Sequence, residues 1–241
     1  MLKRYFISVF LISVCLTFSC STTVYASTKE YGFKITDLSE NEKEQIWQYI
    51  NFKSSVDSVP LNDIGSSIVS FDVSDDDKLL LGFDGNKVAV VEEKTVLNFY
   101  EFTNDGSFYV QWNGRNILLL LVRGSIIVEI SLDGNLVNMI KADESYSENN
   151  SLWNHISRKK CITQGENSYC VQNDIGLFNV FASSYSQLIK TASDGSTTVI
   201  YDVNSEQTVK TISEIIGIFL LVTIVLAGVV LKFTKFKKTK Y

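Results

Sequence analysis

Short apolar, β-branched and aromatic segments alternate with polar turn dipeptides through the middle of the chain. Two-residue turns can join only antiparallel neighbours, so this spacing predicts an antiparallel meander over residues 64–205. The turns expected to be tight are Asp84-Gly85, Asn104-Asp105-Gly106, Asn113-Gly114, Arg123-Gly124 and Asp133-Gly134. The expected strands are 68–73, 78–83, 87–92, 96–102, 107–112, 115–122, 125–131 and 136–141. Residues 117–122 are apolar throughout, which predicts a central strand covered on both faces.

The meander contains a weak internal repeat. Residues 78–91 resemble residues 116–129, with Gly85 aligned to Gly124, and a degenerate third copy runs from 169 to 202. Four strands in about 40 residues are typical of a β-propeller blade, but closure needs at least about four blades. The fold class predicted is therefore mainly β, with blade-like repeats of an incomplete propeller. A twisted meander or a sandwich is the alternative.

Two segments outside the strands have helical or loop character. Residues 37–51 predict a helix, with a capping box between Ser39 and Glu42 and an apolar stripe that should dock on the sheet. That stripe consists of Ile46, Trp47 and Ile50. The polar residues 143–160 indicate a surface loop or a short helix.

The two ends of the chain predict export and membrane anchoring. Residues 215–231 carry no charge, which favours a transmembrane helix over 212–232. The tail 233–241 is rich in lysine and is expected in the cytoplasm. Residues 1–26 have the pattern of a signal peptide cleaved after Ala26, with an uncleaved anchor or a lipoprotein signal at Cys20 as alternatives. The expected localisation is the cell membrane, with residues 27–211 outside.

This exterior domain is acidic. Residues 27–211 contain 26 acids and 15 Lys and Arg, a net charge of −11. The balance argues against a nucleic-acid partner, which needs a basic surface. It suits solubility in the first place, and also cation-rich surroundings or a basic protein partner.

Two cysteines remain after the signal peptide, and their spacing predicts a disulfide. A two-residue turn at Gly165-Glu166 would set Cys161 directly opposite Cys170 as a non-hydrogen-bonded pair. Disulfides persist in exported proteins. Two unpaired core thiols are the alternative.

Other chemistry-bearing residues give weaker signals. Asp72, Asp75, Asp76 and Asp77 could offer oxygen ligands to Ca²⁺, although an acid-rich turn that closes a hairpin explains them better. His155 is the only histidine, and neither a nucleophile elbow nor a phosphate-binding glycine loop occurs. The aromatic residues between 99 and 112 favour cross-strand packing over an exposed contact surface. We therefore expect no cofactor, no catalytic residue and no enzyme.

Four segments together resemble small exported single-pass membrane proteins of Firmicutes. They are Phe71-Asp-Val-Ser-Asp-Asp76, Gly82-Phe-Asp84, Phe181-Ala-Ser-Ser-Tyr-Ser-Gln-Leu188 and Ile200-Tyr-Asp-Val-Asn-Ser205. The resemblance covers most of residues 64–232 and implies an exported domain on one membrane helix. It implies no activity and no site residue.

These observations predict a membrane-anchored, non-enzymatic binding or accessory module. Residues 215–231 should contact membrane lipid, and a protein partner is expected at the cell surface. The alternatives are a subunit of a larger membrane complex, whose helix is the contact, and a membrane-anchored carboxylate hydrolase.

Overall fold

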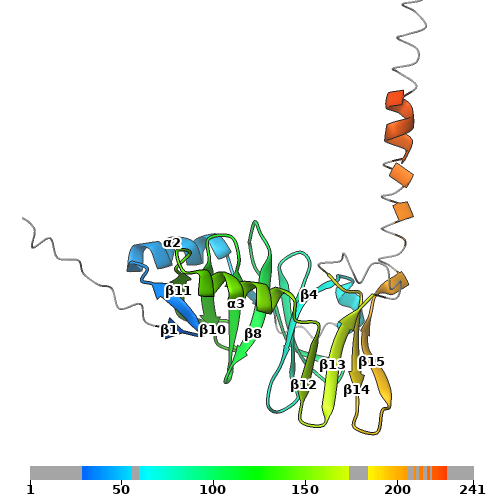
Figure 1. The fold of residues 1–241 in the computed structure, drawn as a ribbon, viewed down its shortest axis with the longest axis horizontal. Coiled ribbons are helices and arrows are strands. Elements are labelled where there is room, and N and C mark those ends of the chain that lie inside the picture. Colours follow the sequence, from blue (N-terminus) through cyan, green and yellow to red (C-terminus); the bar gives the residue numbers. More distant parts are fainter. Residues whose placement is uncertain are drawn as a thin grey trace, which may run out of the picture.

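The computed structural model describes residues 29–55, 60–173, 184–205, 209, 212–213, 216–217 and 219–226. Within them the chain is mainly β, and all strand pairs are antiparallel. Three sheets follow one another across the molecule, as Figure 1 shows from left to right. The predicted signal peptide 1–26 and tail 233–241 lie outside the described residues.

Each sheet contains one four-stranded meander. The middle sheet has β4 (Ile68–Val73), β5 (Leu79–Phe83), β6 (Lys87–Glu92) and β7 (Thr95–Glu101), with β3 (Lys53–Ser55) on its edge. The left sheet has β8 (Phe108–Asn113), β9 (Asn116–Leu121), β10 (Ile126–Ile130) and β11 (Leu136–Ala142), extended by β2 (Phe33–Thr36) and β1 (Lys29–Glu30). The right sheet has β12 (Cys161–Gln164), β13 (Asn167–Gln172), β14 (Gln187–Thr191) and β15 (Thr197–Asp202).

The predicted repeat is confirmed as a structural repeat. Its first two copies fall on β5–β6 and on β9–β10, and Gly85 and Gly124 occupy the same left-handed conformation, at φ 85° and 87°. The third meander differs from the prediction, because it begins at β12 rather than at residue 169. Part of the predicted third copy, residues 174–183, lies outside the described residues.

The sheets stack face to face because alternate side chains point to opposite faces of each strand. In β5, Leu79 and Leu81 pack with residues of β13–β15, whereas Leu80 packs with residues of β8–β11. All five residues of β5 are buried. The middle sheet is thus covered on both faces.

Strand β9 is also covered on both faces, as its sequence predicts. Ile117 and Leu119 face the middle sheet, and Leu118 and Leu120 face the outside of the left sheet. That outer face is covered by β2 and by α3 (Ser147–Ser157), whose Trp153 ring lies 4.8 Å from the ring of Phe33. The segment 143–160 therefore contains a short helix, one of its two predicted forms (Figure 1).

Helix α2 (Glu40–Ile50) forms the predicted capping box, with Ser39 and Glu42 bonded to each other's backbone. Its apolar stripe docks as expected, since Ile50 is fully buried and Ile46 and Trp47 pack beside it. A short 3₁₀ turn, η1 (Leu61–Ile64), contacts β15.

Side chains of β4 hold the free edge of the left sheet. The backbone N–H of Val110 donates to Ser70 Oγ at 3.0 Å, and that of Trp112 donates to an Asp72 carboxylate oxygen at 2.8 Å. The exposed N–H groups of edge strand β8 are thereby satisfied without a further strand. This contact joins the first strands of two meanders.

The predicted transmembrane helix 212–232 falls partly outside the described residues. None of the helices found in the described parts of the chain is long and apolar enough to cross a membrane. The span stays a prediction.

Candidate functional site

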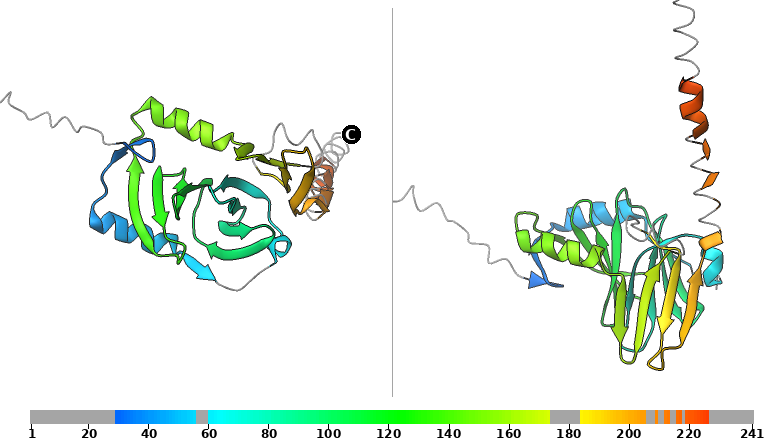
Figure 2. Two further views of the ribbon diagram at one scale, coloured as in Figure 1. Left: turned by 90° about the horizontal axis from the view of Figure 1, so that it is seen from below. Right: turned by 45° about the vertical axis from the view of Figure 1, so that its right-hand side comes forward.

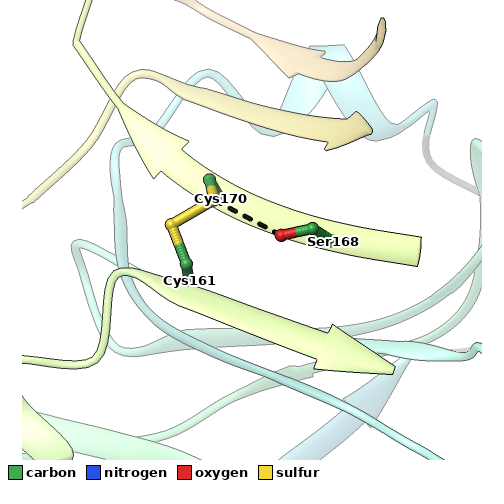
Figure 3. Close-up of a disulfide and its surroundings, with 3 residues drawn as sticks. All are labelled: Cys161, Ser168 and Cys170. Atoms are coloured by element: carbon green, nitrogen blue, oxygen red, sulfur yellow. Dashed lines mark hydrogen bonds between the residues drawn. A yellow bond between two sulfur atoms is a disulfide. The ribbon is translucent and has the colours of Figure 1, made fainter. Parts of the chain in front are cut away.

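The predicted disulfide is present on the outer face of the right sheet (Figure 3). Cys161 and Cys170 are paired across β12 and β13, with Cα atoms 4.2 Å apart. The register of the whole hairpin follows the prediction, down to Gln164 opposite Asn167 at the turn. Ser168 Oγ lies 3.9 Å from Cys170 Sγ.

Replacing both cysteines with serine should destabilise the domain. Closing a loop of this length restricts the unfolded chain, so the loss should be about 2–3 kcal/mol. For a domain of this size that corresponds to a melting temperature lower by about 5–10 °C, measured by circular dichroism. A reductant should lower the melting temperature of the wild type and leave that of the double variant unchanged. Equal melting temperatures without reductant would contradict a stabilising disulfide.

The four aspartates named as weak Ca²⁺ candidates do not form a metal site. Asp72 accepts from Lys159 Nζ at 3.0 Å, and Asp76 pairs with Lys78 Nζ at 2.5 Å. Asp75 and Asp77 accept from the side chains of the β12–β13 turn, each at 3.2 Å. In the described parts of the chain, no three or more His, Cys, Asp or Glu side chains are grouped to hold a metal ion. Asp75 and Asp77 thus connect the β4–β5 turn to the β12–β13 hairpin, and Asp72 connects β4 to the segment after α3.

The same turns border a cleft of about 570 Å³ between the middle and right sheets. One wall comes from the β4–β5 and β6–β7 turns and the other from β13, β14 and β15. A smaller hollow of about 280 Å³ shares Glu93, Lys190 and Ile200 with it. The larger cleft is lined by Asp76, Asp77, Leu79, Glu92, Glu93, Thr95, Leu97, Tyr169, Lys190 and Ile200. A volume of this size is typical of small-ligand sites.

Charge in the cleft is unevenly neutralised. The hydrogen bond from Lys78 lowers the pKa of Asp76, which therefore stays ionised. Lys190 lies with its Nζ 5.4 Å from the centre of the Tyr169 ring, and burial raises the pKa of Tyr169. Glu92 and Glu93 are exposed, and among the described residues neither forms a side-chain hydrogen bond or an ion pair within 4 Å, although the charge of Glu92 acts on Lys78. These two carboxylates are the groups that a ligand could neutralise.

Glu93 is held in an unusual backbone conformation. Its φ is +55° in the two-residue β6–β7 turn, a region that side chains with a Cβ rarely adopt. The turn places Glu93 at the border shared by both hollows. Sequence reasoning missed the cleft, because its walls come from turns and strands about 75–125 residues apart. The acidic dipeptides Asp76-Asp77 and Glu92-Glu93 were the signal that could have indicated it.

The lining combines carboxylates with apolar side chains. Its described residues include no histidine and no cysteine. His155 is exposed on α3, outside the cleft. Carboxylates beside the apolar side chains of Leu79, Leu97 and Ile200 can hold a cation that has an apolar part.

A second polar cluster, around Glu129 of β10, was also missed. Glu129 is only 6% exposed, yet it accepts hydrogen bonds from Tyr31 Oη and from Asn113 and Asn116 Nδ2, the last two at 2.8 Å. Burial alone would raise the pKa of Glu129, but these three donors outweigh it and the pKa is lowered. The sequence contained one sign of this cluster, a glutamate within the otherwise apolar segment 126–130. The cluster fastens the turn between β1 and β2 to the left sheet.

Comparison with known proteins gives little further information. No protein-family model and no curated protein matches the chain. Among solved structures, a catalytically inactive virginiamycin B lyase from Staphylococcus aureus with quinupristin is 14% identical, at a TM-score of 0.29 over 61% of this chain and 45% of that one. A streptogramin B lyase is 16% identical, at a TM-score of 0.28 over 61% and 44%. A protein of unknown function from Bacteroides caccae is 16% identical, at a TM-score of 0.27 over 58% and 67%.

The chain thus spans less than half the length of the two lyases it resembles. At such TM-scores and identities, the likeness supports no argument about activity.

Proposed function

We propose that the chain is a membrane-anchored, exported binding module that holds a positively charged ligand in the cleft between the middle and right sheets. The main support is the position of two exposed carboxylates, Glu92 and Glu93, at the border of a cleft large enough for a small ligand. A cation placed there would gain Coulomb energy, and no bridge within the protein would have to break first.

The anchoring part of the proposal rests on the C-terminal sequence. Residues 215–231 are uncharged, and the described residues from 219 to 226 are helical with apolar side chains that are about half or more exposed. The one hydroxyl among them, Thr223 Oγ1, donates to the carbonyl oxygen of Phe219 at 2.8 Å. In lipid, where no water is available, a polar group of a helix has to form its hydrogen bond within the helix, as this hydroxyl does. A membrane-facing segment explains why these apolar side chains are exposed on the outside of the domain.

The three stacked meanders support the reading as blades of an incomplete propeller. Each has four antiparallel strands in sequence order, and neighbouring meanders pack through their faces. The cleft lies between two of these three sheets.

The proposal predicts weaker cation binding after removal of the two carboxylates. Full-length protein in nanodiscs would be titrated with a fluorescent hexa-arginine peptide and followed by anisotropy. The double variant Glu92→Gln with Glu93→Gln should raise the Kd for the peptide about tenfold. Each exposed ion pair between a glutamate and an arginine of the peptide contributes up to about 1 kcal/mol of binding free energy. The affinity of the wild type should also fall with added salt.

A matched control keeps the change in net charge and moves it away from the cleft. Glu101→Gln with Glu144→Gln removes two exposed carboxylates elsewhere and should leave Kd within about twofold of the wild type. Equal weakening by both pairs would mean that the peptide senses overall charge only, and the cleft would lose its role. A carboxylate hydrolase would instead lose turnover in the cleft variant while keeping its partners.

A further inference from the structure

We infer that the cleft opens on the edge of the domain farthest from the membrane, so that its ligand arrives from the extracytoplasmic space and not from the lipid surface. This inference rests on the proposed function. It assigns the kind of partner, a soluble or wall-borne molecule with cationic groups, and excludes a lipid headgroup as the occupant.

Strand direction decides which edge carries the cleft. Strand β14 runs towards the turn at residues 192–196, and β15 runs back from that turn to Asp202. The cleft is lined by Lys190 near the turn end of β14, by Ile200 within β15, and by the β4–β5 and β6–β7 turns. All these turns lie on one edge of the stacked sheets, the lower edge in Figure 1.

The chain leaves the domain from the opposite edge. After Asp202 the chain continues through Val203 into helix, and every described residue from Asn204 to Leu226 is helical. Figure 1 and the right view of Figure 2 show the described helical residues of this segment on the side opposite the hairpin turns. A helix that follows the last strand so closely places the exit edge towards the membrane.

The resulting separation is large compared with a lipid headgroup. The six residues of β15 span about 20 Å from the cleft edge to the exit edge. The turn edge that borders the cleft therefore lies about 20 Å farther from the membrane than the exit edge, more than the thickness of a headgroup layer.

The test compares the two edges in reconstituted full-length protein. Lys94→Cys places a thiol on the β6–β7 turn at the cleft, and Asn62→Cys places one on η1 at the exit edge. Cys161 and Cys170 are bonded to each other, and Cys15 and Cys20 are replaced with serine in both variants, so a maleimide dye labels only the introduced thiol. Energy transfer to headgroup-labelled lipid in liposomes should be at least about twofold weaker from residue 94 than from residue 62, given the 20 Å offset.

Flotation with liposomes and binding of the hexa-arginine peptide distinguish a failure of this inference from a failure of the proposed function. Equal transfer from both dyes, or stronger transfer from residue 94, would overturn the inference even if the protein binds the hexa-arginine peptide. Failure of the protein to float with liposomes would overturn the anchoring, and with it the orientation. Normal flotation and the expected transfer, with no peptide binding, would support the orientation and reject the cation site.

Discussion

Replacing Glu129 with leucine should lower the free energy of unfolding by about 3–5 kcal/mol. The carboxylate is buried, and its removal would leave the Tyr31 hydroxyl and the Asn113 and Asn116 amides without their acceptor. A buried donor without a partner costs about 1–3 kcal/mol, and these three partly buried donors each lose part of that amount. Urea unfolding followed by tryptophan fluorescence would measure the loss.

Two variants make this prediction specific. Glu129→Gln keeps the shape and an acceptor oxygen but removes the charge, so its loss should be smaller than that of the leucine variant. Glu101→Leu introduces the same side chain at an exposed position of β7 and should change stability by less than about 1 kcal/mol. A leucine at 129 no more costly than one at 101 would show that the cluster does not stabilise the fold.

The same carboxylate should make stability depend on pH on the acidic side. The pKa of Glu129 is lowered on folding from its ordinary value of 4.5, so its ionised form is bound more favourably in the native state. The contribution is therefore complete above pH 4.5 and is lost as pH falls through the lower folded-state pKa. Wild-type stability should fall more steeply below pH 4.5 than that of Glu129→Gln. Parallel pH profiles would contradict this assignment.

The second large effect is expected at Tyr201, which fastens the right sheet to the middle one. Tyr201 is fully buried, and its ring meets the ring of Phe83 edge to face at 5.3 Å. Its hydroxyl donates to the carbonyl oxygen of Ser66 at 2.5 Å and accepts from the N–H of Ser66 at 3.2 Å. Tyr201→Ala should cost about 3–5 kcal/mol, because it opens a cavity between the sheets.

Tyr201→Phe separates the two contributions. It keeps the ring and removes the hydroxyl, and it should cost about 1–2 kcal/mol. Val199→Ala, on the exposed face of the same strand, should cost less than about 1 kcal/mol. Chemical denaturation of the three variants would establish the order. If Val199→Ala were as costly as Tyr201→Ala, the buried interface between the sheets would not be the source of the stability.

Tyr201→Ala should also disturb the cleft, whereas the Glu129 variants should not. Ile200, beside Tyr201, lines the cleft wall, and the Glu129 cluster lies on the far side of the left sheet. Binding of the hexa-arginine peptide to both sets of variants would test whether the spacing of the middle and right sheets sets the width of the site.

Local features were readable from the sequence by itself. Strand and turn positions depend on two-residue alternation and on turn residues, so the predicted strands 68–73 and 87–92 match β4 and β6 residue for residue. The capping box of α2 and the register of Cys161 with Cys170 also follow from spacing within ten residues. These features depend on residues close together in the chain, so the order of residue types is enough to predict them.

Only the tertiary structure decided which distant segments meet. Tyr31 reaches Glu129 across 98 residues, and Lys159 reaches Asp72 across 87. The cleft exists because the acidic turn at Glu92 and Glu93 faces strands that come about a hundred residues later. The physical reason is that face-to-face packing of the sheets, and not any local preference of the chain, sets these neighbours. Alternation along a strand says which side chains share a face, but not what that face will cover.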